Sequence, residues 1–261
     1  MLEVNHALTT GEDSLAGGKP GCGATTQPLG AWWAIGFALV FPTLLTVVYF
    51  VWMSTAATQL QQVSFAIGKG VQFAFPLAWL MLFERQKVKF RWPNLREVGE
   101  GAILGGVIVA AMLVFYVWWL EPSGQFDPAK VAIRAKLSSL GIDSPPLFLA
   151  AALFYCLCHS FLEEYYFRWF LFGRLLPLAG MPMAVIVSAL GFMAHHVVVL
   201  GTYCGYGSLL TWFLSFCVAV GGVLWAIQYR RTGALYGSWI SHMLVDAGIF
   251  AIGYSLLVSG F

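Results

Sequence analysis

Long runs of apolar residues recur along the chain, and short segments rich in charged residues, Gly and Pro separate them. A helix needs roughly 20 residues to cross about 30 Å of hydrocarbon. Seven runs reach this length: 30–53, 62–83, 101–120, 146–173, 182–202, 208–228 and 234–259. The fourth is longer than one crossing requires, so it is expected to be tilted, bent or divided into two elements. The pattern therefore predicts an all-α, polytopic membrane helix bundle of about seven or eight transmembrane helices.

The composition favours a membrane protein over a soluble one. Hydrophobic residues make up 59% of the 261 residues and charged residues only 10%, whereas soluble domains carry about 25% charged residues. Aromatic residues reach 16%, including 11 Trp, which suits belts of indole rings at the headgroup level of a bilayer. The cysteines have no paired spacing, so neither a disulfide framework nor a zinc knuckle is expected from Cys22, Cys156, Cys158, Cys204 and Cys217.

The chain divides into a polar N-terminal part and one apolar domain. Residues 1–29 are rich in Gly and Thr and lack the basic start and apolar core of a signal peptide, so a disordered polar tail is expected there. Residues 30–261 are expected to form a transmembrane helical domain. In its longest connection, 121–145, Asp127 is a good N-cap and Pro128 suits a first helical turn. This connection is either a short amphipathic helix on the membrane surface or an ordinary ordered loop.

The basic residues between the apolar runs predict an orientation. Two connections, after the second and the sixth run, are rich in Lys and Arg, and cytoplasmic loops carry such an excess. The N-terminus is therefore expected to be cytoplasmic, with the C-terminus outside for seven spans and inside for eight. The basic cluster is expected to set topology and not to bind nucleic acid. It comprises Arg85, Lys87, Lys89, Arg91 and Arg96, with Arg230 and Arg231 in the later turn.

Ionisable residues inside the apolar runs are the clearest functional signal. An acid or an Arg at mid-helix costs about 2.5 to 3.5 kcal/mol even on the lenient insertion scale. Three acids, one Arg and four His lie on three of the runs. They need a common explanation, which a shared polar cavity between these helices provides. They are Glu163, Glu164, Asp246, Arg168, His159, His195, His196 and His242.

The spacing of these residues orders them further, because residues four apart share a helix face. A carboxylate beside a histidine can take a proton from water, which prepares the water for attack on an amide. Further donors must then stabilise the oxyanion that develops. The pairs that share a face are His159 with Glu163, Glu164 with Arg168, Phe192 with His196, and His242 with Asp246.

Three short motifs also resemble a known family. The segments are EEYYFR at 163–168, FMAHH at 192–196 and HMLVD at 242–246. Their order and spacing resemble the CAAX prenyl protease and bacteriocin-processing family, the type II CAAX prenyl endopeptidase group, over about 146–250. The resemblance implies a glutamate-type intramembrane endopeptidase without a metal or cofactor. Its expected partners are the lipid bilayer and a peptide or protein substrate, such as a CAAX-like C-terminal tail or a leader or bacteriocin-type peptide.

The resemblance also implies roles for individual residues. Glu163 would be the general base on water, and His196 would hold or share that water. Glu164 and Arg168 would support the site, unless Arg168 faces a substrate carboxylate. Phe192 would be a supporting residue that packs against the site. The short length fits a bacterial cell membrane protein.

The oxyanion side would be formed by His242 and Asp246. Many members of the family carry Asn where this chain has Asp246. An ionised Asp would repel an oxyanion, so Asp246 would have to be protonated or would have to orient His242 instead.

Other interpretations of the same residues stay open. A zinc protease could use Glu163, His196 and His242, although no His-Glu-x-x-His helix is present. A proton-coupled transporter or a scaffold could use the same intramembrane cluster. The Glu164–Arg168 pair could serve helix packing alone. His195 is expected to pack behind the site or to contact it indirectly.

Overall fold

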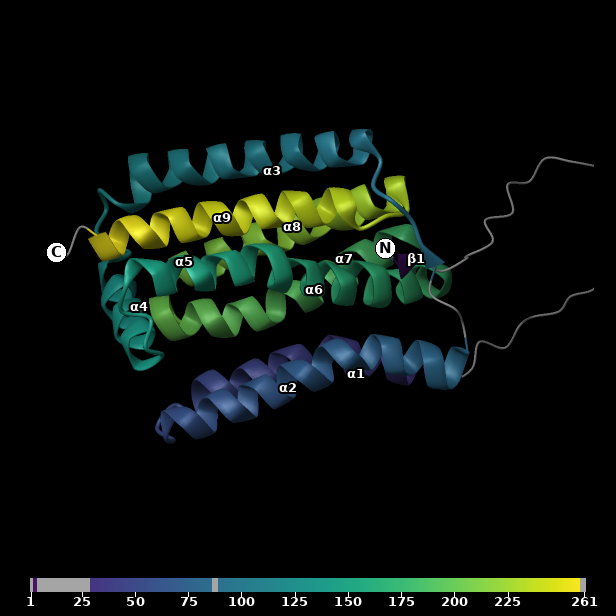
Figure 1. The fold of residues 1–261 in the computed structure, drawn as a ribbon, viewed down its shortest axis with the longest axis horizontal. Helices are drawn as coiled ribbons and strands as arrows, with labels where there is room; N and C mark the ends of the chain where they lie inside the picture. Colours follow the sequence, from purple (N-terminus) through teal and green to yellow (C-terminus); the bar gives the residue numbers. More distant parts are fainter. Residues whose placement is uncertain (1, 4–28, 86–88, 259–261) are drawn as a thin grey trace, which may run out of the picture.

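The computed structural model describes residues 2–3, 29–85 and 89–258, and this part of the chain is almost wholly helical (Figure 1). The predicted tail, residues 1–29, lies almost entirely outside the described residues. Two-residue strands β1 (Leu2–Glu3) and β2 (Lys89–Phe90) pair antiparallel. The α-helices are α1 (Leu29–Val47), α2 (Thr58–Trp79), α3 (Leu95–Phe115), α4 (Asp127–Ser139), α5 (Pro145–Leu153), α6 (Ser160–Glu164), α7 (Gly173–Cys204), α8 (Leu209–Thr232) and α9 (Tyr236–Val258).

Five π-helical segments continue or join these helices. Two of them flank the short helix α6, so that residues 145–172 run as one irregular helical rod. Such segments place side chains off the regular 3.6-residue register and are frequent at functional sites. The segments are Val48–Trp52, Leu80–Glu84, Tyr116–Leu120, Phe154–His159 and Tyr165–Phe172.

The prediction of an all-α, multi-pass membrane protein is confirmed. Within the described residues, five helices are long and apolar enough to cross a membrane. The longest, Pro145–Cys204, contains a break at Gly180, where φ is 74° and ψ is 171°. Gly tolerates this conformation because it has no Cβ. Each of the seven predicted apolar runs is helical over nearly all of its described residues, but the number of crossings stays a prediction. The five helices are Gly30–Trp52, Thr58–Glu84, Leu95–Leu120, Pro145–Cys204 and Leu209–Thr232.

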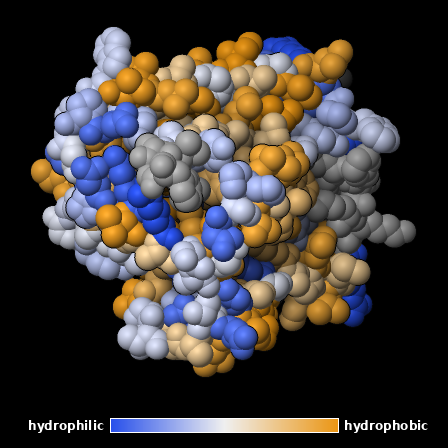
Figure 2. Space-filling model, turned by 60° about the vertical axis from the view of Figure 1, so that its left-hand side comes forward, coloured by the Kyte–Doolittle hydropathy of each residue, from blue (hydrophilic) through white to orange (hydrophobic). Residues whose placement is uncertain are grey.

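The connection between α3 and α5 contains a helix, as the first of the two interpretations expects. Helix α4 begins at Asp127 with Pro128 in its first turn. The expectation that Asp127 is the N-cap is wrong, because Phe126 occupies that position. Asp127 instead pairs with Lys130 at 2.7 Å between Oδ1 and Nζ, and this hydrogen bond raises the pKa of Lys130. In Figure 2 the molecule is turned so that the left-hand side of Figure 1 comes forward. On this face, hydrophilic side chains gather between apolar ones.

The buried core surrounds the Tyr165–Phe172 segment, whose side chains are all buried. Helices α1 and α2 lie along one side of this rod, and α8, α9 and α3 lie along the other (Figure 1). Many large apolar side chains point outward instead, among them Ile103, Trp118 and Phe216. Outward apolar side chains are what a lipid-facing surface requires, so the polar residues of the core are the exception to explain.

Small residues bring α3 against α9, the helix that carries two predicted site residues. A Cβ on Gly101 would lie 2.4 Å from the carbonyl oxygen of Gly237. A Cβ on Gly105 would lie 2.9 Å from Cα of Ser241. Glycines four apart let two membrane helices approach at backbone distance. This contact fixes the position of α9 in the bundle.

Candidate active site

Glu163 stands at the centre of the polar cluster and is 4% exposed. Its Oε1 lies 3.2 Å from Nε2 of His159 and 3.4 Å from Nε2 of His195, and its Oε2 lies 3.7 Å from Nε2 of His242. The three histidines come from the same rod as Glu163, from α7 and from α9. A buried carboxylate is costly unless polar groups surround it. Ionisable side chains from these three helices therefore meet in one buried polar cluster around Glu163.

A second carboxylate, Glu164, lies beside the first and is fully buried. Its Oε1 is 3.0 Å from Nη1 of Arg168 and 2.9 Å from Nδ1 of His242. The Arg168 guanidinium also lies 4.5 Å from the ring centroid of Phe192 and 5.0 Å from that of Trp225. Arg168 is only 2% exposed. This geometry favours a supporting role for Arg168 over direct contact with a substrate.

The contact with Glu164 determines which His242 nitrogen faces the centre. A carboxylate oxygen accepts, so Nδ1 of His242 donates to it and Nε2 points to the other side. There, Nε2 lies 3.7 Å from Oδ1 of Asp246 as well as from Glu163. The indole of Trp225 stacks on the imidazole, with ring centroids 4.2 Å apart and planes 14° apart. Glu164 and Trp225 therefore fix His242 from two directions.

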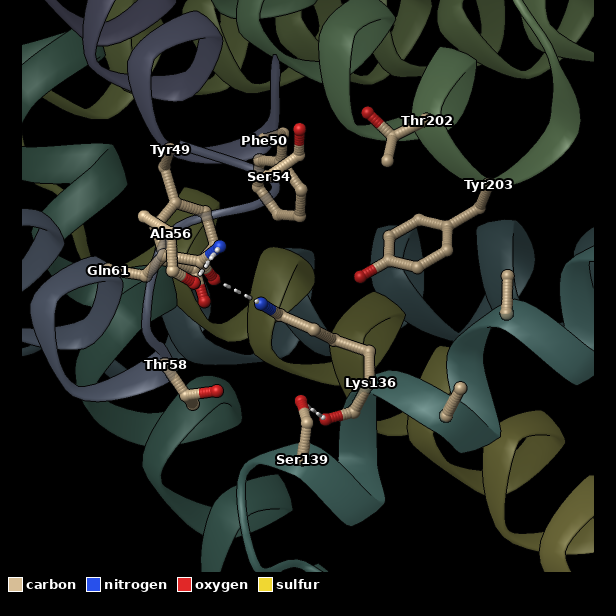
Figure 3. Close-up of a pocket in the computed structure, with 12 residues that line it drawn as sticks. Tyr49, Phe50, Ser54, Ala56, Thr58, Gln61, Lys136, Ser139, Thr202 and Tyr203 are labelled. Atoms are coloured by element: carbon tan, nitrogen blue, oxygen red, sulfur yellow. Dashed lines mark hydrogen bonds between the residues drawn. The ribbon is translucent and has the colours of Figure 1, made fainter. Parts of the chain in front are cut away.

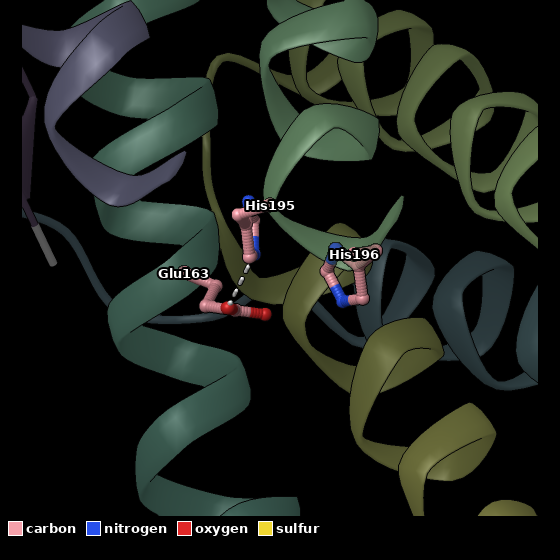
Figure 4. Close-up of side chains that lie close together, drawn as sticks. All are labelled: Glu163, His195 and His196. Carbon is pink, nitrogen blue, oxygen red and sulfur yellow. Dashed lines mark ion pairs between the residues drawn. The ribbon is translucent and has the colours of Figure 1, made fainter. Parts of the chain in front are cut away.

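His196 is oriented by its own helix. Its Nδ1 lies 2.9 Å from the backbone oxygen of Phe192, one turn earlier. Because a carbonyl can only accept, Nδ1 carries the proton, and Nε2 of the neutral ring keeps its lone pair. The His196 ring lies 4.2 Å from that of His195, which borders Glu163 (Figure 4). His196 can therefore accept a hydrogen bond or bind a metal close to Glu163.

The predicted supporting residue Phe192 lies where these groups meet. Its ring is 4.6 Å from that of His196 and 5.7 Å, edge-on, from that of His242. The Phe192 ring also lies under the Arg168 guanidinium. This one ring therefore contacts both histidines and the cation. The three motifs are thus brought to one place.

One group of described residues has the geometry to hold a metal ion. Glu163, His195 and His196 each offer a ligand atom, and these atoms lie within 4.8 Å of one another. Two imidazoles and a carboxylate with an open position are a common catalytic zinc set. The set differs from the one considered for the zinc hypothesis, because His195 takes the place of His242.

Sequence reasoning missed or underrated two residues of the cluster. His195 was expected to pack or to contact the site indirectly, yet its Nε2 lies 3.4 Å from Glu163. The adjacent pair His195–His196 was the available signal. Trp225 was not singled out because its helix, α8, carries no ionisable residue at that level. Nothing in the sequence says that its ring lies under His242.

Comparison with known families gives one match. Residues 145–248 match the model described as "Type II CAAX prenyl endopeptidase Rce1-like". Comparisons with curated proteins and with solved structures give no match. The matched segment begins with α5 and ends within α9, and it contains every residue of the cluster. The resemblance drawn from the three motifs is confirmed: over residues 145–248 this integral membrane protein is similar to the type II CAAX prenyl endopeptidase Rce1-like family, a family of proteases.

Proposed function

We propose that the protein is an intramembrane endopeptidase in which the Glu163 carboxylate activates water to hydrolyse a peptide bond. The observation that carries this proposal is the buried Glu163 carboxylate with imidazole nitrogens 3.2 Å, 3.4 Å and 3.7 Å away. Such an arrangement holds a base and its proton partners together where bulk water is scarce.

The chemical step follows from these positions. Glu163 takes a proton from a water molecule that also donates to Nε2 of His196. The resulting hydroxide attacks the carbonyl carbon of the scissile bond, and the C–N bond breaks as the proton on Glu163 passes to the leaving nitrogen. His159 and His195 border Oε1 of Glu163, so they limit the carboxylate to one orientation. General base catalysis of this kind contributes about 10²- to 10⁴-fold.

His242 and Asp246 form the proposed oxyanion side. To donate to an oxyanion, Nε2 of His242 must carry a proton in addition to the one on Nδ1. The carboxylates of Glu163, Glu164 and Asp246 lie around this ring, and their charge would balance an imidazolium. Asp246 would then act through His242, which resolves the conflict between an ionised Asp and an oxyanion.

The proposed substrates are peptides or proteins at the membrane, with CAAX-like C-terminal tails or leader or bacteriocin-type peptides as the two classes. The proposed location is a bacterial cell membrane with a cytoplasmic N-terminus. The basic connections after the second and the sixth apolar run support this orientation.

A zinc-dependent protease is the second candidate. It is supported by the ligand atoms of Glu163, His195 and His196, which lie within 4.8 Å of one another. In that case the metal would activate the water, and Glu163 would be a ligand instead of the base.

One experiment separates these candidates. The protein and its Glu163→Gln variant are purified in detergent and assayed on a quenched peptide library, with and without a chelator. Gln keeps the shape of Glu and removes the base. The metal-free mechanism requires cleavage by the wild type, loss of about 10²-fold or more in the variant and no effect of the chelator. Loss of cleavage with the chelator favours zinc, and equal cleavage by both proteins would refute a catalytic Glu163. A stable protein that cleaves nothing would favour the transporter or scaffold interpretation.

A further inference from the structure

A cavity of about 360 Å³ lies where the α1–α2 connection, α4 and the end of α7 meet (Figure 3). Lys136 of α4 is the one charged residue among the twelve that line it. Its Nζ lies 3.2 Å from Oε1 of Gln61 and 4.6 Å from the ring centroid of Tyr49. The Gln61 amide nitrogen donates to the backbone oxygen of Met53, so Oε1 is turned toward Lys136. The ammonium is therefore held at the cavity wall by its neighbours.

We propose that this cavity binds the C-terminal carboxylate of the substrate peptide through Lys136. The inference rests on the proposed endopeptidase function and names the part of the substrate that is recognised. Gln61 accepts only one of the three N–H donors of Lys136, so the others can serve an anion. One lysine matches the single charge of a carboxylate, whereas a phosphate is typically met by several cations or by the fork of an Arg.

The rest of the lining suits the same ligand. No Asp or Glu is among the twelve lining residues, so nothing in the wall repels an anion. Tyr203 points into the cavity from the end of α7 (Figure 3). Within the described part of the chain, the phenol oxygens of Tyr49 and Tyr203 are not used in any hydrogen bond, and each can donate to a carboxylate oxygen.

The position of the cavity relative to Glu163 allows one peptide to occupy both. Tyr203 follows His196 by seven residues on α7, which places both on one face about 10 Å apart at 1.5 Å per residue. That distance is spanned by roughly three extended residues. Between the two places lies Tyr155, whose ring is 5.0 Å from that of His159. Tyr155 is close enough to Tyr49, Tyr203 and Glu163 to interact with each electrostatically.

The test compares two quenched peptides of one apolar sequence, one ending in a free carboxylate and one in a carboxamide. The wild type is assayed beside Lys136→Met, which keeps the chain length and removes the charge. Lys130→Met is the matched control, because Lys130 lies on the same helix, pairs with Asp127 and does not line the cavity. We expect the wild type and Lys130→Met to favour the carboxylate peptide by about tenfold or more in kcat/KM. Lys136→Met should cleave both peptides at the carboxamide rate.

Binding to the Glu163→Gln variant provides a readout that does not need activity. The carboxylate peptide should bind it more tightly than the carboxamide peptide, and Lys136→Met in the same background should abolish the difference. If this holds while the wild type cleaves nothing, the endopeptidase proposal fails and the carboxylate site stands.

Three results would overturn the site. The first is that the wild type cleaves both peptides with equal kcat/KM and that the Glu163→Gln variant binds them equally tightly. The second is a carboxylate preference that survives Lys136→Met and disappears in Lys69→Met, because Lys69 of α2 also interacts with Glu163 and would then hold the carboxylate instead. The third is Lys136-dependent binding of a short-chain anionic phospholipid without any discrimination between the peptides, which would assign the cavity to a lipid phosphate.

Discussion

Glu164 binds His242 and Arg168 through the same oxygen: Oε1 lies 2.9 Å from Nδ1 of His242 and 3.0 Å from Nη1 of Arg168. The two residues of the EE pair therefore have different surroundings. Glu163 faces three imidazole nitrogens, whereas Glu164 joins a cation to the histidine on α9. This division supports the proposal that the first Glu acts in the chemistry and the second in positioning.

Glu164→Gln should reduce both stability and activity. The change leaves Arg168 buried without its counter-charge, which costs about 3 to 5 kcal/mol when one partner of a buried pair is removed. It also replaces a charged acceptor with a neutral amide oxygen, so the hydrogen bond that fixes the His242 tautomer becomes weaker. Thermal unfolding in detergent and peptide cleavage measure the two effects.

The double variant Glu164→Gln with Arg168→Met separates these effects. Without the unpaired cation, stability should recover by much of the loss, while activity should stay low because the hydrogen bond that orients His242 is still weakened. A double variant as unstable as Glu164→Gln alone would show that the ion pair does not explain the stability loss.

Asp246 should tolerate an amide better than truncation. Oδ1 of Asp246 lies 3.7 Å from Nε2 of His242, and Asn keeps an oxygen near that position that still orients the ring, although it no longer balances the charge of an imidazolium. We expect Asp246→Asn to keep activity within about tenfold and Asp246→Ala to lose about 10²-fold, the scale of one oxyanion-side contact. The measurement is kcat on one cleaved peptide. If Asp246→Ala were fully active, Asp246 would be excluded from the oxyanion side.

The two adjacent histidines should differ if the mechanism is metal-free. His196→Gln removes the proposed water contact and should lower kcat by about 10²-fold or more. His195→Gln keeps a polar group near Oε1 of Glu163 and should lower kcat by about tenfold at most. The two variants have similar packing, so each serves as a control for the other.

A zinc site predicts a different pattern for the same variants. Glu163, His195 and His196 would each be ligands, so either His variant would lose the metal along with activity. Elemental analysis of the purified proteins therefore decides between the two patterns. Stoichiometric zinc in the wild type and its loss in both variants would refute the metal-free mechanism.

The local spacing of the site could be predicted from the sequence, but its contacts between helices could not. Positions four apart share a face in any helix, so the pairing of His159 with Glu163 and of Glu164 with Arg168 follows from numbering alone. The contact of His195 with Glu163 depends on how α7 is rotated against the rod. That rotation depends on packing, which no single segment encodes.

The helices of the fold could also be predicted from the sequence, but their irregularities could not. Apolar runs gave all the long helices, because a bilayer imposes a minimum length. The π-helical segments were not foreseen, since they leave the apolar pattern unchanged, whereas the break at Gly180 falls between the fourth and the fifth predicted run. The cavity at Lys136 was also missed, because it combines segments as far apart in sequence as Gln61 and Tyr203.

The contact between α3 and α9 should be needed for the site even though α3 carries none of its residues. Gly101→Ala would place a Cβ 2.4 Å from the carbonyl oxygen of Gly237, a backbone atom that cannot move aside alone. The helices must then separate, at a cost of about 1 to 3 kcal/mol for overpacking, and α9 would carry His242 away from Glu164. Activity should therefore fall together with the unfolding temperature.

Gly106→Ala is the matched control for this change. A Cβ at Gly106 meets nothing within 4 Å, so the same substitution five residues later in the same helix should leave activity unchanged. Its unfolding temperature should stay the same or rise, because Ala favours a helix over Gly by up to about 1 kcal/mol. Equal behaviour of the two variants would mean that α3 does not hold α9 in place. A loss confined to Gly101→Ala would show that backbone-distance packing by a helix without site residues positions the proposed oxyanion side of the centre.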